Sequence, residues 1–427
     1  MEHTTLNLIL SSVIFISAYL LIMWDKLDRT VVALSGASLM ILFKILAQEN
    51  AFKEIDWNTL GLLISMMVIV MIAKRSGVFE YLAIKTVKIA RGEPIKIIIL
   101  LAIITGVLSS VLDNVTTILL ILPVTLSIAK DLHLNPIPFI ISEVFASNVG
   151  GTATLIGDPP NIMIGSAAGL NFMDFIRNDA VIALPLLFIT TYILVLFYRK
   201  TLVTTTKAKV KIMSMNEKEC IKDHKLLLKS LLVLGLMILG FMLHSVLHYE
   251  SATVAISGAV ILLLASNIRP EKVFHEVEWK TIFFFVGLFI MVGGIKEAGV
   301  IKILAKSVIA TTHGNLALTT MAILWVSAIA SAFVDNIPFV ATMIPLIKDM
   351  GTMSGMNLTP VWWALSLGAC LGGNGTIIGA SANVIATGMA EEHGHKITFG
   401  KYFKIAFPIM ILTIAICSIY LYIFYLA

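Results

Sequence analysis

Residues 148–161 read Asn-Val-Gly-Gly-Thr-Ala-Thr-Leu-Ile-Gly-Asp-Pro-Pro-Asn, and an apolar run lies on either side of them. Adjacent glycines, two prolines and an aspartate are residues that a continuous membrane helix avoids. The stretch therefore predicts a helix that breaks inside the bilayer. Such a break is tolerated in lipid only where its freed N–H and C=O groups face protein or a water-filled cavity. The break thus indicates a binding site.

Residues 372–383 repeat this pattern as Gly-Gly-Asn-Gly-Thr-Ile-Ile-Gly-Ala-Ser-Ala-Asn. Two interrupted apolar segments, in corresponding positions of two halves of a chain, point to the midplane binding site of a secondary transporter. The pair of breaks therefore predicts transport rather than catalysis.

The composition places the whole chain in a membrane. Of its 427 residues, 58% are apolar and only 13% are charged, whereas soluble proteins average about 25% charged residues. We expect an all-α polytopic protein with about ten spans of roughly 20 residues each. The net charge of +5 reflects topology, so the bilayer and not nucleic acid is the expected partner. The three cysteines share no short spacing, which argues against a disulfide framework or a zinc site.

One constant offset of 222 residues aligns the two halves. It brings residues 113–114 onto 335–336, and residues 150–161 onto 372–383. The chain is therefore interpreted as a first repeat over residues 1–199, a basic linker over 200–225, and a second repeat over 226–427.

An Asp-Asn pair interrupts one apolar stretch in each half, and a proline follows the Asn by nine residues. Each stretch predicts a re-entrant hairpin with its tip at residues 113–114 or 335–336. Five full spans remain per half, and an odd number gives the halves opposite orientations, as in an inverted repeat. This topology places 24 of the 31 Lys and Arg residues on the linker side. We expect that side to be cytoplasmic, and both termini to lie on the outer side of the cytoplasmic membrane.

The breaks supply backbone and side-chain ligands for a substrate or a Na⁺ ion, and no other cofactor is expected. Close packing of membrane helices is the alternative explanation of the glycines. Four asparagines at the tips and after the breaks offer both donors and acceptors, so they leave the sign of the substrate charge open. The expected ligands are Asn114, Asn148, Gly150, Gly151, Thr152, Thr154, Asp158, Asn161, Asn336, Gly373, Asn374, Thr376, Ser381 and Asn383.

Four carboxylates are candidates for coupling, because an ionisable residue at membrane depth usually has a function. Asp158 is the first choice, since its counterpart in the second repeat is Ala380 and only one half carries the charge. Asp113 and Asp335 either couple transport or cap the helix that follows each tip. Glu143 is a second candidate proton site or an inward-facing structural residue.

No arginine is expected at the level of the breaks, which weighs against an arginine clamp for a phosphate or dicarboxylate. An intramembrane enzyme is a further class of function to consider. It would need a His-Glu-x-x-His run or a nucleophile with its base at membrane depth. The sequence contains no such run. We therefore expect a protein that is not an enzyme.

The two motifs, residues 150–161 and 372–383, resemble the paired signatures of the ion transporter superfamily. That superfamily includes ArsB-type arsenite permeases, NhaD-type Na⁺/H⁺ antiporters and citrate transporters. The second motif, continued by Glu391, His393 and Gly394, is most similar to the prokaryotic relatives of the melanosomal P protein. The resemblance covers essentially the whole chain.

This resemblance implies a homodimer that works as an elevator. The scaffold would comprise the first three spans of each half, with residues 226–312 in the second, and the transport part would comprise residues 97–199 and 316–427. It also implies Na⁺- or H⁺-coupled secondary transport of a small inorganic ion or carboxylate. The alternatives are an uncoupled chloride conductance, a Na⁺/H⁺ antiporter and an arsenite or antimonite efflux permease.

Overall fold

The computed structural model describes residues 2–24, 26–214 and 216–427, and these ranges are helical with no strand among them. By length and composition, eight of the described helices can cross a membrane. They are α1 (Glu2–Trp24), α4 (Trp57–Lys74), α7 (Asn114–Asp131), α10 (Phe172–Tyr198), α12 (His224–Leu247), α15 (Trp279–Glu297), α17 (Leu316–Phe333) and α21 (Phe399–Leu421). The expectation of an all-helical polytopic membrane protein is confirmed at this level.

Three shorter helices are also strongly apolar: α2 (Arg29–Leu42), α6 (Pro94–Ser109) and α13 (Ser251–Ser266). The remaining helices are α3 (Gln48–Glu54), α5 (Val78–Ile89), α8 (Ile137–Thr152), α9 (Pro159–Ala168), α11 (Thr206–Met213), α14 (Pro270–Phe274), α16 (Val300–Thr311), α18 (Asn336–Ser354), α19 (Thr359–Gly372) and α20 (Ser381–Glu392). Short segments η1 (Glu217–Cys220) and η2 (Gly373–Gly375) are 3₁₀-helical, and η3 (Tyr422–Leu426) is π-helical.

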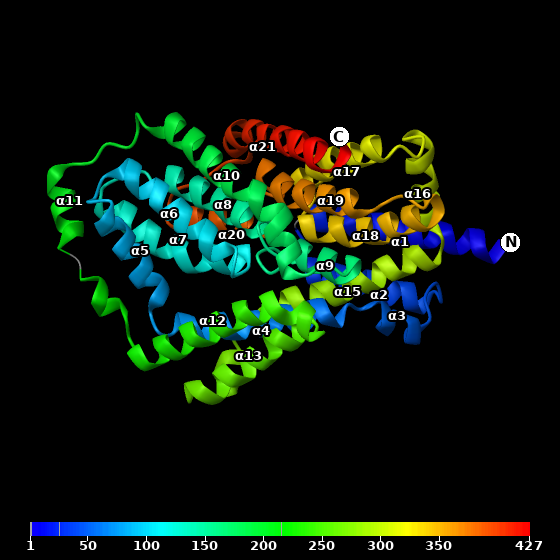
Figure 1. Ribbon diagram of the computed structural model, residues 1–427, viewed down its shortest axis with the longest axis horizontal. Helices are drawn as coiled ribbons and strands as arrows, with labels where there is room; N and C mark the ends of the chain where they lie inside the picture. The colour runs from blue at the N-terminus through cyan, green and yellow to red at the C-terminus, as the bar shows by residue number, and fades with distance from the viewer. Residues whose placement is uncertain (1, 25, 215) are drawn as a thin grey trace.

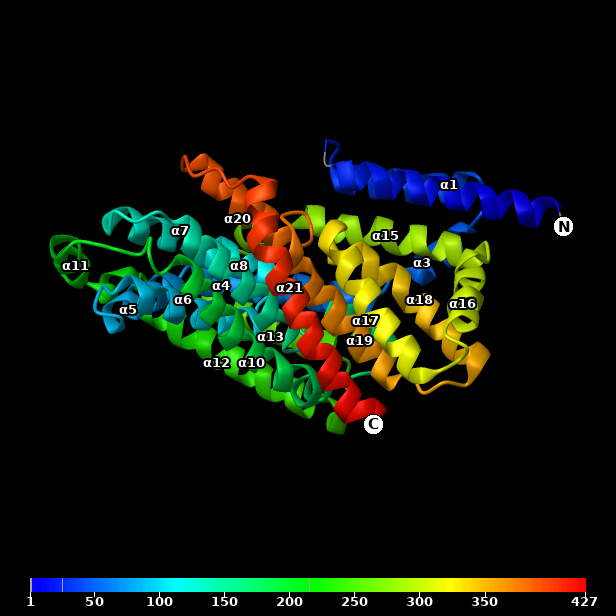
Figure 2. The same cartoon turned by 90° about the horizontal axis from the view of Figure 1, so that it is seen from above.

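The two halves contain the same series of elements, α4–α9 in the first and α15–α20 in the second. Helix α2 packs on α15, and α13 packs on α4. Helix α7 contacts α20, and α18 contacts α9, so each hairpin meets the second half-helix of the other half. Helices α5 and α11 lie toward one end of the long axis, and α16 lies toward the opposite end with the N-terminus (Figures 1 and 2).

Both broken helices are interrupted within the stretches that the sequence singles out. Helix α8 ends at Thr152 and α9 begins at Pro159, while α19 ends at Gly372 and α20 begins at Ser381. Proline is compatible with the first turn of a helix because the N–H groups there have no intrahelical partner. The Asp-Pro-Pro sequence therefore restarts the helix directly after the break.

The basic linker docks on α5 rather than crossing open solvent. Lys88 Nζ lies 2.6 Å from Glu217 Oε2, Lys209 Nζ lies 2.7 Å from Glu93 Oε1, and the Lys222 amide donates to the Ser76 carbonyl at 2.9 Å. These ion pairs hold the pKa of both glutamates below the usual range. Gly77, with a φ of 83°, allows the close approach, because a Cβ on it would lie 1.8 Å from the Cys220 carbonyl oxygen.

We expect Gly77→Ala to release the linker, and its repeat counterpart Gly299 provides a matched control. Gly299 has a φ of 85°, but nothing lies within 4 Å of a Cβ built on it. Both alanines carry left-handed strain of about 1–2 kcal/mol, and only Gly77→Ala adds a clash with the linker backbone. Gly77→Ala should therefore unfold at a lower temperature than Gly299→Ala, and limited proteolysis should cleave its linker faster. Equal melting temperatures and equal cleavage would contradict the docking.

Candidate functional site

A small cavity lies where the two hairpin tips meet the first helix break. Its volume is about 20 Å³, which suits a single water-sized occupant. Its polar lining comes from five elements or their caps, namely α2, α7, α9, α15 and α18, together with the start of α20. The lining residues are Arg29, Leu63, Met67, Asp113, Asn114, Val115, Asp158, Pro159, Glu278, Thr281, Asn336, Ile337 and Ser381.

Asp158 has an unusual environment for a helix-capping position. It precedes α9 directly, yet its side chain makes no capping hydrogen bond, and it is fully buried. The Asn336 amide donates to its two oxygens at long distances of 3.4 and 3.3 Å, and the Cys370 thiol also interacts with it. A carboxylate has about four acceptor positions. Asp158 therefore keeps acceptor capacity for a cation or a proton.

The other two aspartates at the hairpin tips are used by the fold. Asp113 caps α7 by accepting from the Thr116 amide at 2.8 Å and from the Thr116 hydroxyl. Asp335 caps α18 through the Ile337 amide at 3.1 Å and accepts from Ser381 Oγ at 2.6 Å. Both residues therefore make capping bonds, Asp335 also contacts Ser381 and Arg29, and Asp158 differs from both in having no capping bond.

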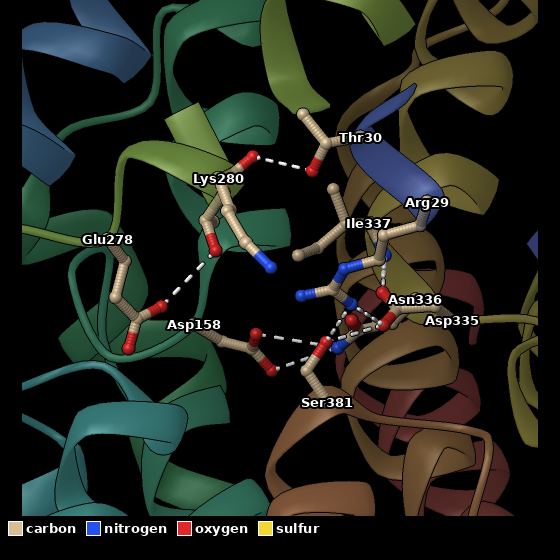
Figure 3. Close-up of polar contacts among 10 residues, drawn as sticks. Arg29, Thr30, Asp158, Glu278, Lys280, Asp335, Asn336, Ile337 and Ser381 are labelled. Atoms are coloured by element: carbon tan, nitrogen blue, oxygen red, sulfur yellow. Dashed lines mark hydrogen bonds and ion pairs between the residues drawn. The ribbon is translucent and has the colours of Figure 1, made fainter. Parts of the chain in front are cut away.

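Arg29 lies at the site, so the expectation that no arginine reaches this level is wrong. Its guanidinium donates to Ser381 Oγ at 2.6 Å and to Asp335 Oδ2 at 3.3 Å (Figure 3). It also lies over the Phe284 ring, 5.3 Å from the centroid. The sequence places Arg29 at the start of a span far from both breaks, and only the tertiary structure, in which α2 packs on α15 and α15 contacts α18, brings it there.

A larger, open cavity of about 340 Å³ lies next to this arginine. Lys26, Asp28, Arg29, Asp335 and Ser381 form its polar lining. The Lys280 ammonium holds the pKa of Asp28 below its usual range. Arg29 and Ser381 line both cavities, whereas Asp335 lines only the open one, so the Arg29–Ser381 contact lies between the open cavity and the small one.

Four asparagines form a chain of amide hydrogen bonds that joins the two halves. Asn114 Nδ2 donates to Asn148 Oδ1 at 3.1 Å. Asn148 Nδ2 donates to Asn374 Oδ1 at 3.0 Å and to Asn383 Oδ1 at 2.9 Å. The first hairpin, the first broken helix and the second broken helix are therefore connected through one buried side chain.

Asn161 and Asn383 hold the broken segments in shape. Asn161 Nδ2 donates to the carbonyls of Thr152 and Thr154 at 3.1 and 3.0 Å. Asn383 Nδ2 makes the corresponding bonds to Gly373 and Thr376, both at 2.8 Å. These amides satisfy carbonyls that the break frees, so they shape the site without lining the small cavity.

The threonines and glycines of the breaks are used in packing. The hydroxyls of Thr152, Thr154 and Thr376 donate to backbone carbonyls of Asn148, Ser110 and Ala332. A Cβ on Gly150 would lie 2.1 Å from the Gly106 carbonyl oxygen, and one on Gly151 would lie 2.6 Å from that of Gly157. Close packing, the alternative explanation of the glycines, describes these contacts.

Glu143 lies away from the small cavity. It is buried, and Thr125 donates to its Oε1 at 2.6 Å, while Oε2 has no partner among the residues that the structure describes. Three polar residues that the sequence analysis did not single out are also buried or line the cavity: Asp179, Glu278 and Ser366. Asp179 lies in α10 just before the apolar run 181–198, in a segment that also carries Asp174 and Arg177, so no isolated charge within a span marked it in the sequence.

The described residues hold no group of three or more His, Cys, Asp or Glu side chains placed to bind a metal ion. All three cysteines are free thiols. Any cation at this site would therefore be held by Asp158 and the other oxygen atoms that line the small cavity.

Comparison with known proteins adds independent information. A family model described as "Citrate transporter" matches residues 19–368. The chain is 42% identical over 418 residues to the uncharacterized transporter Rv2684 of Mycobacterium tuberculosis (strain ATCC 25618 / H37Rv), covering 96% of this chain and 97% of that protein. It is 40% identical over 424 residues to the 46 kDa membrane protein of Mycobacterium leprae (strain TN), covering 98% and 99%.

The chain is also similar to the human P protein, at 32% identity over 496 residues. This alignment covers 96% of this chain but 59% of the P protein. Among solved structures, the YdaH transporter of Alcanivorax borkumensis matches with a TM-score of 0.61 at 15% identity, over 98% of this chain and 97% of the other. This last similarity concerns the fold alone.

Proposed function

Because the chain belongs to the citrate transporter family, and is a membrane transporter and not an enzyme, we propose that it is a secondary active transporter. It moves a small carboxylate or inorganic ion, driven by Na⁺ or H⁺, and Asp158 is the coupling residue.

The uncapped, buried side chain of Asp158 is the observation that carries this proposal. The two aspartates at the hairpin tips, Asp113 and Asp335, make capping bonds, whereas the contacts of Asp158 leave acceptor capacity facing a cavity of about 20 Å³. Burying an uncompensated carboxylate is costly. A coupling cation or a proton removes that cost. Its binding at Asp158 therefore changes the stability of the contacts between the two hairpin tips and the first helix break.

Arg29 supports an anionic substrate. Guanidinium groups bind carboxylates with charge-assisted and often bidentate hydrogen bonds. The open cavity of about 340 Å³ beside Arg29, with Lys26 on its wall, has room for a small carboxylate. The matching family model carries the description "Citrate transporter", and citrate is accordingly the first solute to test.

We further propose an inverted repeat with elevator motion. The transport part comprises residues 97–199 and 316–427, and the rest of the two repeats forms the scaffold of a homodimer. The reciprocal contacts of α2 with α15, α13 with α4, α7 with α20 and α18 with α9 support a two-fold relation between the halves. Arg29 then joins the scaffold to the transport part. In this topology the linker is cytoplasmic and both termini lie outside the cytoplasmic membrane.

The test is solute flux into proteoliposomes that contain a pH-sensitive dye. Citrate, chloride, Na⁺ and arsenite are added in turn, with and without an imposed membrane potential. Citrate uptake driven by a Na⁺ or proton gradient would support the proposal. Na⁺-driven proton movement without citrate would favour an antiporter, and chloride current without gradient coupling would contradict coupled transport.

A further inference from the structure

Ser366 on α19 lies between two oxygen atoms that both require a donor. Its Oγ is 2.5 Å from Asp179 Oδ2 on α10 and 2.7 Å from Asn161 Oδ1 on α9. All three side chains are fully buried. The hydroxyl has a single proton, so it can donate to only one of these neighbours.

The orientation of the Asn161 amide follows from its other contacts. Its Nδ2 faces the carbonyl oxygens of Thr152 and Thr154 at 3.1 and 3.0 Å. Reversing the amide would set its oxygen against those carbonyls. Asn161 Oδ1 therefore faces Ser366, and it accepts from the Ser366 hydroxyl and from the Cys370 thiol at 3.4 Å.

Asp179 must then supply the remaining proton. If its carboxyl group were ionised, one of the two short oxygen–oxygen contacts of Ser366 would contain no hydrogen and would be repulsive. A protonated Asp179 donates to Ser366 Oγ, and Ser366 donates to Asn161 Oδ1, so that both contacts are satisfied. The second oxygen, Asp179 Oδ1, has no partner in the described part of the chain, which costs less for a neutral carboxyl than for a charged one.

The groups around Asp179 carry no compensating positive charge. The titratable side chains that face it are Cys370 on α19, Cys417 and Tyr420 on α21, and Tyr425 on η3. Arg177, two residues before it on α10, is exposed. None of the facing side chains can form an ion pair with a carboxylate at neutral pH.

We propose that Asp179 is a proton-binding site separate from Asp158, in which the proton holds the first helix break in the shape seen here. When the proton leaves, the Ser366 hydroxyl turns to the Asp179 carboxylate, and Asn161 Oδ1 loses its hydroxyl donor. The amide that holds the carbonyls of Thr152 and Thr154 is then less well fixed. The link to transport rests on the proposed function, but proton binding itself does not require a known substrate.

Infrared spectroscopy of the full chain in lipid nanodiscs at neutral pH tests the protonation directly. We expect Asp179→Asn to lose one carboxylic-acid C=O band relative to the unmodified protein. Asn is a close isostere, and its Nδ2 donates to Ser366 Oγ as the protonated carboxyl does. The matched control is Asp174→Asn, in the first turn of the same helix, which should leave the carboxylic-acid region unchanged. An unchanged band in Asp179→Asn would overturn the inference.

Hydrogen exchange then tests the link to the break. After correction for intrinsic rates, protection of residues 153–158 should fall with rising pH in the unmodified protein and in Asp174→Asn. It should remain high in Asp179→Asn, whose donor cannot be lost. Ser366→Ala should show low protection at every pH. Protection that is independent of pH in the unmodified protein would overturn the proposed action on the break, whether or not the protein transports citrate.

Discussion

Asp158→Asn should reduce gradient-driven uptake of citrate to the background of empty liposomes. An amide neither neutralises a cation nor exchanges a proton in the accessible pH range, so the driving ion loses its binding group. We expect thermal stability to change little, because Asn336 still donates to an oxygen at this position and a neutral amide is less costly to bury than a charge. The measurement is uptake with the Na⁺ or proton gradient imposed and with it collapsed.

Asp113→Asn is the matched control for this experiment, since Asp113 lines the same small cavity. Asn caps helices about as well as Asp, so the bond from the Thr116 amide persists and coupled uptake should be retained. Coupled uptake that survives in Asp158→Asn would remove Asp158 from the mechanism. Equal loss in both variants would assign coupling to the shared negative charge of the cavity and not to Asp158 itself.

Arg29→Gln should weaken citrate binding by about 10- to 100-fold, which corresponds to a charge-assisted hydrogen bond of about 1.5–3 kcal/mol. The guanidinium is the cation that lines both the small and the open cavity, with Asp335 and Ser381 as its present partners. A carboxylate that enters the open cavity can compete for it. The measurement is the dissociation constant of citrate for the purified protein, obtained by calorimetry.

Two further variants separate recognition of the anion from damage to the fold. Lys26→Gln removes an exposed charge from the same open cavity without touching Asp335 or Ser381, and it should change the affinity for citrate far less. Arg29→Gln combined with Asp335→Asn removes both members of the ion pair, so no carboxylate is left unpaired. Restored stability with affinity still low would assign Arg29 to substrate binding. Equal affinity in Arg29→Gln and Lys26→Gln would contradict that assignment.

The positions of the helix breaks could be predicted from the sequence, because local chemistry decides them. Pro159 and Pro160 are accepted only in the first turn of a helix, and α8, α9, α19 and α20 end and begin in the predicted stretches. A Gly-Gly pair alone does not break a helix, since residues 293–294 lie inside α15. The constant offset between the halves likewise anticipates the matching series of elements. Asp113 and Asp335 could be interpreted as caps, since an aspartate before a helix is a local signal.

The partners of each side chain could not be predicted in the same way. Arg29 lies more than 300 residues from Asp335 and Ser381 along the chain, and no pattern near Arg29 indicates that contact. The pairing of Asp179 with Ser366 is of the same kind, with 187 residues between them. Several candidates in the breaks, such as Thr154 and Asn161, turned out to hold backbone carbonyls away from the small cavity.

The sequence by itself determined where the membrane helices break, which residues start each half-helix, and that the chain is a membrane transporter. Only the tertiary structure decided which charged groups meet. Helix breaks follow from the combination of glycine, aspartate and proline residues within a short stretch, whereas an ion pair or a shared hydroxyl depends on how whole helices pack. Asp158 therefore stands out in the sequence, and Arg29 and Asp179 become candidates only in the fold.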